Sequence, residues 1–160
     1  MEVIFSMVDK LYDLQNGYKF YLKIRRNIAV IRGDSATGKS FIFSQIKALQ
    51  AWNDDPNCTD KFDEFLIVNT DEGVLLFLQS EVHDKIIAID RYDFFASKYP
   101  ELSDKAVQSC KNNHVIICGR GCAPQNIARN NDYGILVYNT DKKRFRIRYL
   151  FSMDDLLTED

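Results

Sequence analysis

The middle of the chain alternates between short apolar runs and segments with helical spacing. The apolar runs cover residues 28–31, 64–69, 85–90 and 114–119. Runs of this kind, rich in β-branched residues and without polar alternation, are typical of strands buried on both faces of a parallel sheet. The segments between them predict helices over 41–49, 72–82 and 91–111, the last interrupted at Pro100. We therefore expect a mainly parallel sheet with helices on both faces.

The two ends of the chain follow a different pattern, in which apolar and polar residues alternate. Residues 2–8 and 18–25 alternate in this way, and Asn16-Gly17 before the second segment is a turn signal. Residues 133–138 and 144–151 alternate around the polar segment 139–143. The pattern predicts an antiparallel β-hairpin at the N-terminal end and another at the C-terminal end.

Length and composition indicate a single globular domain over residues 1–160, with 46% hydrophobic residues. The net charge of −2 gives no bulk attraction to nucleic acid or anionic membranes. No apolar stretch approaches the ~20 residues that span a bilayer, and the first residues do not form a secretory signal. The four cysteines lack zinc-site spacing. These features predict a cytoplasmic protein.

The most informative motif lies between the first apolar run and the first predicted helix. Gly33-Asp34-Ser35-Ala36-Thr37-Gly38-Lys39-Ser40 matches G-x-x-x-x-G-K-[ST], the phosphate-binding P-loop or Walker A motif. Its glycines let the backbone approach phosphate, and its N–H groups cradle phosphate oxygens. Lys39 reaches the β- and γ-phosphates, and the Ser40 hydroxyl ligates Mg²⁺. The predicted nucleotide-binding residues are Gly33, Asp34, Ser35, Ala36, Thr37, Gly38, Lys39, Ser40 and Phe41.

A second motif ends the third apolar run. Ile86-Ile87-Ala88-Ile89-Asp90 is an apolar strand ending in a carboxylate, which is the Walker B pattern. If this strand lies beside the P-loop strand, Asp90 can hold the Mg²⁺ shell together with Ser40. The alternative is that Asp90 only caps the helix that follows.

Together these motifs resemble the P-loop NTPase superfamily, in particular its AAA, RecA-like and ABC-type ATPase branch. The resemblance covers roughly residues 18–120, and the segment 18–40 looks most like the front of an ABC-type nucleotide-binding domain. It implies a three-layer α/β/α fold in which the core strands have the spatial order 5-1-4-3-2. The second to fourth of these strands would be residues 64–69, 86–90 and 115–118. It also implies binding of ATP, or another NTP, with Mg²⁺.

The chain departs from that branch at four points. Arg91 stands where the branch usually has the glutamate that polarises the attacking water, and Asp93 is the nearest carboxylate. The fourth strand ends in Cys118-Gly119-Arg120 rather than in a polar sensor residue. An L-S-G-G-Q-like motif and a helical lid are also missing. We therefore expect nucleotide binding with slow hydrolysis.

Two interpretations are open for Arg120 and two for the arginines of the last predicted strand. Arg120 is the best candidate to stabilise transition-state charge, which would make Lys39, Asp90 and Arg120 the catalytic set; the alternative is a surface arginine in a loop. Arg144, Arg146 and Arg148 form either a basic stripe for nucleic acid or, as we favour, the solvated face of an edge strand.

Three functions remain open from the sequence. The leading hypothesis is a weak ATPase or nucleotide-dependent switch that works with a protein partner or by self-association. The second is a protein-interaction module, for instance of a phage or mobile element, in which the nucleotide is structural or vestigial. The third is a small-molecule kinase, for which the length is suitable but a substrate-pocket motif is missing.

Overall fold

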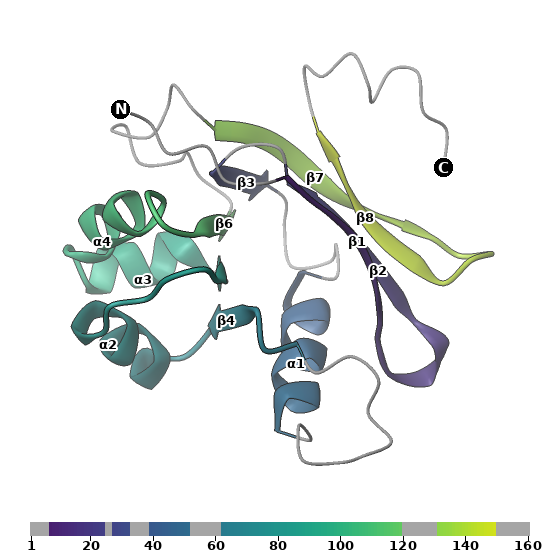
Figure 1. Ribbon diagram of the computed structural model, residues 1–160, viewed down its shortest axis with the longest axis horizontal. Helices are drawn as coiled ribbons and strands as arrows, with labels where there is room; N and C mark the ends of the chain where they lie inside the picture. The colour runs from purple at the N-terminus through teal and green to yellow at the C-terminus, as the bar shows by residue number, and fades with distance from the viewer. Residues whose placement is uncertain (1–6, 25–26, 33–38, 52–61, 120–130, 150–160) are drawn as a thin grey trace.

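The computed structural model describes residues 7–24, 27–32, 39–51, 62–119 and 131–149. Its strands and helices follow one another in the order expected for an α/β domain with a hairpin at each end (Figure 1). The strands are β1 (Val8–Asp13), β2 (Lys19–Ile24), β3 (Ile28–Arg32), β4 (Phe65–Val68), β5 (Ile86–Ile89), β6 (His114–Gly119), β7 (Asn131–Asn139) and β8 (Arg144–Tyr149). The helices are α1 (Lys39–Gln50), α2 (Asp71–Gln79), α3 (Tyr92–Lys98) and α4 (Leu102–Ser109), with a short 3₁₀ turn at Gln15–Gly17.

The described strands form one eight-stranded mixed sheet in the order β1-β2-β8-β7-β3-β6-β5-β4. All neighbours from β7 to β4 pair in parallel. The register pairs Arg32 of β3 with Gly119 of β6, and Ile89 of β5 with Ile117 of β6. The carboxyl ends of β3, β5 and β6 therefore meet at the same edge of the sheet.

Helices lie against the two faces of the parallel strands. Every residue of β5 and most residues of β6 are therefore buried. On one face α1 packs through Ile42, Phe43 and Ile46, which share a core with the inner faces of both hairpins. On the other face α2, α3 and α4 contribute a second core that contains Phe77 and Phe95. Figure 1 shows α2, α3 and α4 grouped on one side of the sheet and α1 on the other. The predicted α/β class is confirmed.

The two predicted hairpins are present, with differences in extent and in placement. The first pairs β1 with β2, and its first strand covers residues 8–13. Residues 2–6 of the predicted strand lie outside the described part of the chain. The second pairs β7 with β8 as expected. Parallel pairing of β2 with β8 joins the two hairpins. Strand β8 is therefore an interior strand of the sheet. The interpretation of β8 as an edge strand is therefore wrong, although its arginines do alternate with buried Phe145, Ile147 and Tyr149.

Side-chain hydrogen bonds hold α1 in place at two points along its length. Gln50 Nε2 donates to the backbone oxygens of Phe62 and Phe65 at 2.9 and 2.7 Å, where β4 begins. Gln45 Oε1 accepts from the backbone N–H of Gln15, in the turn of the first hairpin, at 3.2 Å. These contacts and the buried apolar side of α1 fix the direction in which its first turn points.

Helix α2 ends earlier than the sequence suggests, at Gln79 rather than at Val82, and it begins at a capping residue. The Thr70 hydroxyl accepts from the backbone N–H of Gly73 at 3.0 Å. Such a cap satisfies one of the backbone donors that a helix leaves unpaired at its first turn.

Thr70→Ala should therefore lower the free energy of unfolding by about 1 kcal/mol. Urea denaturation followed by circular dichroism measures this change. Ser97→Ala, at an exposed position of α3, is the control and should change stability by less than about 0.5 kcal/mol. Equal midpoints for Thr70→Ala and the unaltered protein would show that the cap contributes nothing.

Candidate functional site

The structure brings together two residues that the sequence assigned to a magnesium site. Ser40 lies in the first turn of α1, and Asp90 directly follows β5. The Ser40 hydroxyl donates to Asp90 Oδ2 at 2.9 Å. The second carboxylate oxygen, Oδ1, accepts from the backbone N–H of Arg91 at 2.9 Å. A serine at a helix N-terminus and an aspartate 50 positions away in sequence thus share one site.

Asp90 reaches Ser40 although its strand is not adjacent to β3. The two strands are not neighbours, because β6 lies between them. Helix α1 crosses the sheet face on which the Asp90 side chain lies, and its first turn closes the gap. The capping interpretation of Asp90 is disfavoured. The residue before α3 is Arg91, and α3 has no side-chain capping hydrogen bond.

The electrostatic setting of Asp90 suits a bound cation. Its side chain is buried, with 4% of its surface exposed. The two hydrogen bonds that the described side chains and backbone give this carboxylate come from uncharged groups, the Ser40 hydroxyl and the Arg91 N–H. Buried carboxylates are normally paired with a cation or coordinate a metal. The positive end of the α1 dipole offsets only part of this charge.

The oxygen donors at this point fit Mg²⁺ better than a transition metal. Mg²⁺ favours one or two protein oxygens and takes its remaining ligands from water and substrate phosphates. The hydroxyl of Ser40 and the carboxylate of Asp90 provide such a pair. Among the described residues, no group of three or more His, Cys, Asp and Glu side chains forms a complete protein cage. The residues present therefore fit a shared protein–phosphate site.

Arg91 points away from the end of β6, toward β4. Its Nη2 donates to the backbone oxygen of Asn69 at 3.1 Å, and its guanidinium lies 5.1 Å from the ring centre of Phe95. Nearby, hydrogen bonds from Lys98 and then Tyr99 hold the pKa of Asp71 below its ordinary value of 3.8. Arg91 is thus part of an exposed polar cluster at the β4 side of the strand edge.

The sequence did not indicate where Asp93 lies. Asp93 is in the first turn of α3, and its carboxylate lies against Gly119, the last residue of β6. A methyl group added to Gly119 would stand 2.6 Å from Asp93 Oδ2 and 3.1 Å from its Cγ.

Phe41 follows Ser40 and belongs to an aromatic cluster that joins α1 to the hairpins. Its ring centre is 5.2 Å from that of Tyr18 and 5.8 Å from that of Phe145. Tyr138 lies 4.5 Å from Phe145, and Lys143 Nζ lies 4.3 Å from the Tyr18 ring centre. Phe41 remains 38% exposed. These contacts hold its ring beside the first turn of α1.

Several predicted site residues lie outside the described part of the chain. They are Gly33, Asp34, Ser35, Ala36, Thr37, Gly38 and Arg120. For Lys39 the structure describes the backbone, which begins α1, but not the side chain. The P-loop assignment therefore rests on the sequence motif and on the two elements that flank it, β3 and α1.

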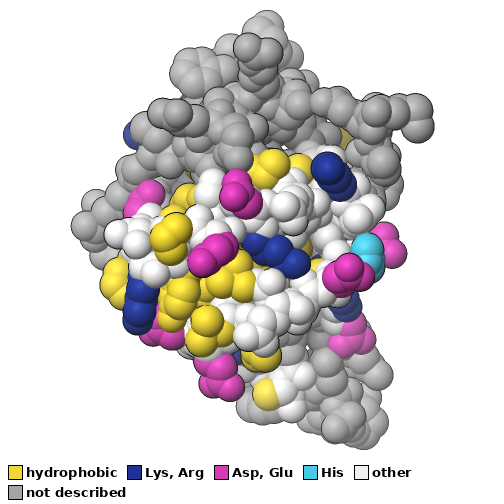
Figure 2. Space-filling model, turned by 90° about the vertical axis from the view of Figure 1, so that its left-hand side faces the viewer, with side chains coloured by type: hydrophobic (Ala, Val, Ile, Leu, Met, Phe, Trp, Pro, Cys, Tyr) yellow, Lys and Arg dark blue, Asp and Glu magenta, His cyan; other side chains and the backbone are white. Residues whose placement is uncertain are grey.

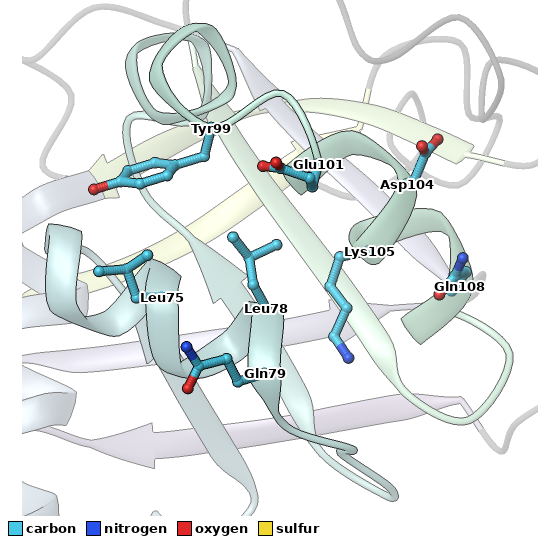
Figure 3. Close-up of a pocket in the computed structure, with 8 residues that line it drawn as sticks. All are labelled: Leu75, Leu78, Gln79, Tyr99, Glu101, Asp104, Lys105 and Gln108. Atoms are coloured by element: carbon cyan, nitrogen blue, oxygen red, sulfur yellow. The ribbon is translucent and has the colours of Figure 1, made fainter.

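A groove on the opposite side of the molecule is separate from these residues. It has a volume of about 480 Å³ and lies between α2 and α4 (Figure 3). Its lining residues are Leu75, Leu78, Gln79, Tyr99, Glu101, Asp104, Lys105 and Gln108. Figure 2 shows apolar side chains gathered among charged ones on this face. Leu75, Leu76 and Phe94 are 45%, 59% and 52% exposed.

Comparisons with known proteins assign no family to the chain. No family description matches it, and no curated protein sequence is significantly similar to it. Among the described helices, none has the length and apolar character needed to cross a membrane.

Proposed function

We propose that this chain is a P-loop nucleotide-binding protein of the α/β/α type that binds ATP with Mg²⁺ and hydrolyses it slowly. The hydrogen bond from Ser40 to the buried carboxylate of Asp90 carries this proposal. It joins the last residue of the Walker A motif to the last residue of the Walker B motif. The parallel strand order β7-β3-β6-β5-β4 corresponds to the order 5-1-4-3-2 that the resemblance implies, and it supports the same assignment.

In this proposal the chain's own residues bind and orient the substrate. The backbone of 33–38 and Lys39 hold the phosphates, at the positive end of α1. Ser40 and Asp90 hold Mg²⁺, which withdraws charge from the phosphate oxygens when it is bound. Arg120 is proposed to stabilise charge that develops on the transferring phosphoryl group. The site lies at the carboxyl ends of the strands, where ligands bind in open α/β sheets.

A protein partner is part of the proposal, because apolar side chains are exposed on α2 and α3. They are Leu75 and Leu76 of α2 and Phe94 of α3. This observation favours the alternative in which the chain is an interaction module and the nucleotide only stabilises it. The two functions differ in phosphate release: a switch turns ATP over, whereas a module with structural nucleotide binds ATP without producing phosphate.

The purified chain should bind ATP with Mg²⁺ in calorimetry and release phosphate well below the roughly 10 s⁻¹ median of enzymes. The reason is that Arg91 replaces the usual glutamate, and positioning of the attacking water contributes much of the rate. A steady-state assay over a series of protein concentrations measures the turnover. Fast release that is independent of protein concentration would contradict slow intrinsic hydrolysis, and absence of ATP binding would contradict the proposed function.

Arg91→Glu tests whether the side chain at position 91 faces the attacking water. Because the Arg91 side chain is directed to Asn69, a glutamate there should not face the site, and we expect turnover within about twofold of the unaltered protein. A rise of tenfold or more would show that position 91 faces the attacking water after all.

A further inference from the structure

The end of β6 carries an unusual arrangement of a glycine and a carboxylate. Gly119 has no side chain, and Asp93 from α3 lies where that side chain would begin, with Oδ2 2.6 Å from the place of a Cβ atom. The Asp93 carboxylate therefore takes the position of a polar residue at the end of this strand. A larger residue at position 119 would displace it.

The end of β6, where Gly119 meets Asp93, lies between β3 and β5, the strands that precede the Walker A motif and Asp90. Gly119 is paired with Arg32, the residue directly before the P-loop segment, and β6 separates β3 from β5. Asp90 contacts α1 on one face of the sheet, whereas Asp93 belongs to α3 on the other. Asp90 and Asp93 therefore lie on opposite faces of the sheet, and Asp93 is the one that meets the end of β6.

We propose that Asp93 is the catalytic carboxylate that orients the attacking water for hydrolysis of the bound nucleotide. This inference rests on the proposed function. Arg91 is turned toward β4 by its hydrogen bond to Asn69. Asp93 is the neighbouring acidic side chain that lies at the end of β6. It would thus serve in place of both the missing glutamate and the missing sensor residue.

In the proposed step Asp93 accepts a hydrogen bond from the water molecule. The water oxygen bonds to the γ-phosphorus while the bond between that phosphorus and the β–γ bridging oxygen breaks. The proton of the water passes to the Asp93 carboxylate and then to phosphate or solvent. The products are ADP and inorganic phosphate, and no redox partner is needed.

Asp93→Asn tests the proposal, because the amide preserves the shape of the side chain but not its basicity. We expect phosphate release in single turnover to fall about 100-fold, with ATP–Mg²⁺ affinity within twofold of the unaltered protein. Binding of ADP with aluminium fluoride, which mimics the transferring phosphoryl group with its attacking water, should weaken, while binding of ADP alone should not.

Asp104→Asn is the matched control, since Asp104 is also an exposed acidic residue in the first turn of a helix. It should leave all three measurements unchanged. Gly119→Ala is a second variant that moves the carboxylate without removing it, and it should lower phosphate release while ATP binding persists.

Four other results would contradict the proposed role of Asp93. Unaltered phosphate release and fluoride-complex affinity in Asp93→Asn would overturn the role of Asp93 alone. Equal losses of phosphate release in Asp93→Asn and Asp104→Asn would show an effect of surface charge, and they would also overturn the proposed role of Asp93. Loss of ATP binding in Asp93→Asn would make Asp93 a binding or structural residue. Failure of the unaltered protein to bind ATP would overturn the proposed function together with this inference.

Discussion

Replacement of Lys39 by alanine is expected to weaken ATP binding roughly 100-fold or more. In the proposed site, Lys39 is the cation that compensates the β- and γ-phosphates. Removing one partner of a desolvated charge pair costs about 3–5 kcal/mol, because the other charge stays buried without compensation. Calorimetric titration of ATP in the presence of Mg²⁺ measures the change.

Lys47→Ala is the control for this variant. Lys47 lies on the same helix α1, two turns farther on, and its exposed side chain donates to Asn69 Oδ1 at 3.0 Å. Both variants gain the same helix-forming residue, so a common effect on α1 would appear in both. Equal ATP affinity in Lys39→Ala and the unaltered protein would refute the P-loop assignment, whereas equal weakening in both variants would point to a general effect on the helix.

The buried strands and their helices were predictable because their sequence signals are local. The run 114–119 contains almost only residues suited to a fully buried strand, and β6 covers that same range. The interruption at Pro100 also separates α3 from α4 as expected. Strand order is not a local property, and for the central strands it was available only through the resemblance carried by the two motifs.

The joining of the two hairpins was not predictable from the residues of either one. Parallel pairing of β2 with β8 connects segments more than a hundred residues apart, with Lys19 beside Arg144. The alternating pattern of β8 identifies its buried face but not its neighbours. A strand with one face open to water has the same alternating sequence pattern at the edge of a sheet and in its interior.

The meeting of Ser40 and Asp90 was predictable from the sequence, whereas the position of Asp93 was not. The motifs identified Ser40 and Asp90, which the structure brings into contact. The position of Asp93 depends on the backbone of Arg91, which has a φ of 49°. Residues other than glycine rarely adopt this left-handed conformation. The turn sends Arg91 toward β4 and begins α3 so that Asp93 meets Gly119, and the composition of the segment gives no sign of it.

Asp90→Asn is expected to remove most of the gain in ATP affinity that Mg²⁺ provides. The amide is close in shape to the carboxylate, so its oxygen can still accept from the Arg91 N–H, and its NH₂ group can donate to the Ser40 hydroxyl oxygen. The negative charge is lost, and interactions with a charged group are worth about 1.5–3 kcal/mol, or roughly 10- to 100-fold in affinity. ATP titrations with Mg²⁺ and with a chelator, on each protein, give the magnesium-dependent part of the binding.

Ser40→Ala and the double variant Ser40→Ala, Asp90→Asn complete a cycle that separates a shared cation from independent effects. If both residues hold the same ion, the second substitution should cost much less than the first, since one ligand alone no longer holds the cation well. Asp104→Asn, a change of the same kind far from Ser40, should keep the full response to Mg²⁺. An identical Mg²⁺ response in Asp90→Asn and the unaltered protein would reduce the Ser40–Asp90 contact to a structural link between α1 and β5, and additive losses in the cycle would place the two residues on separate interactions.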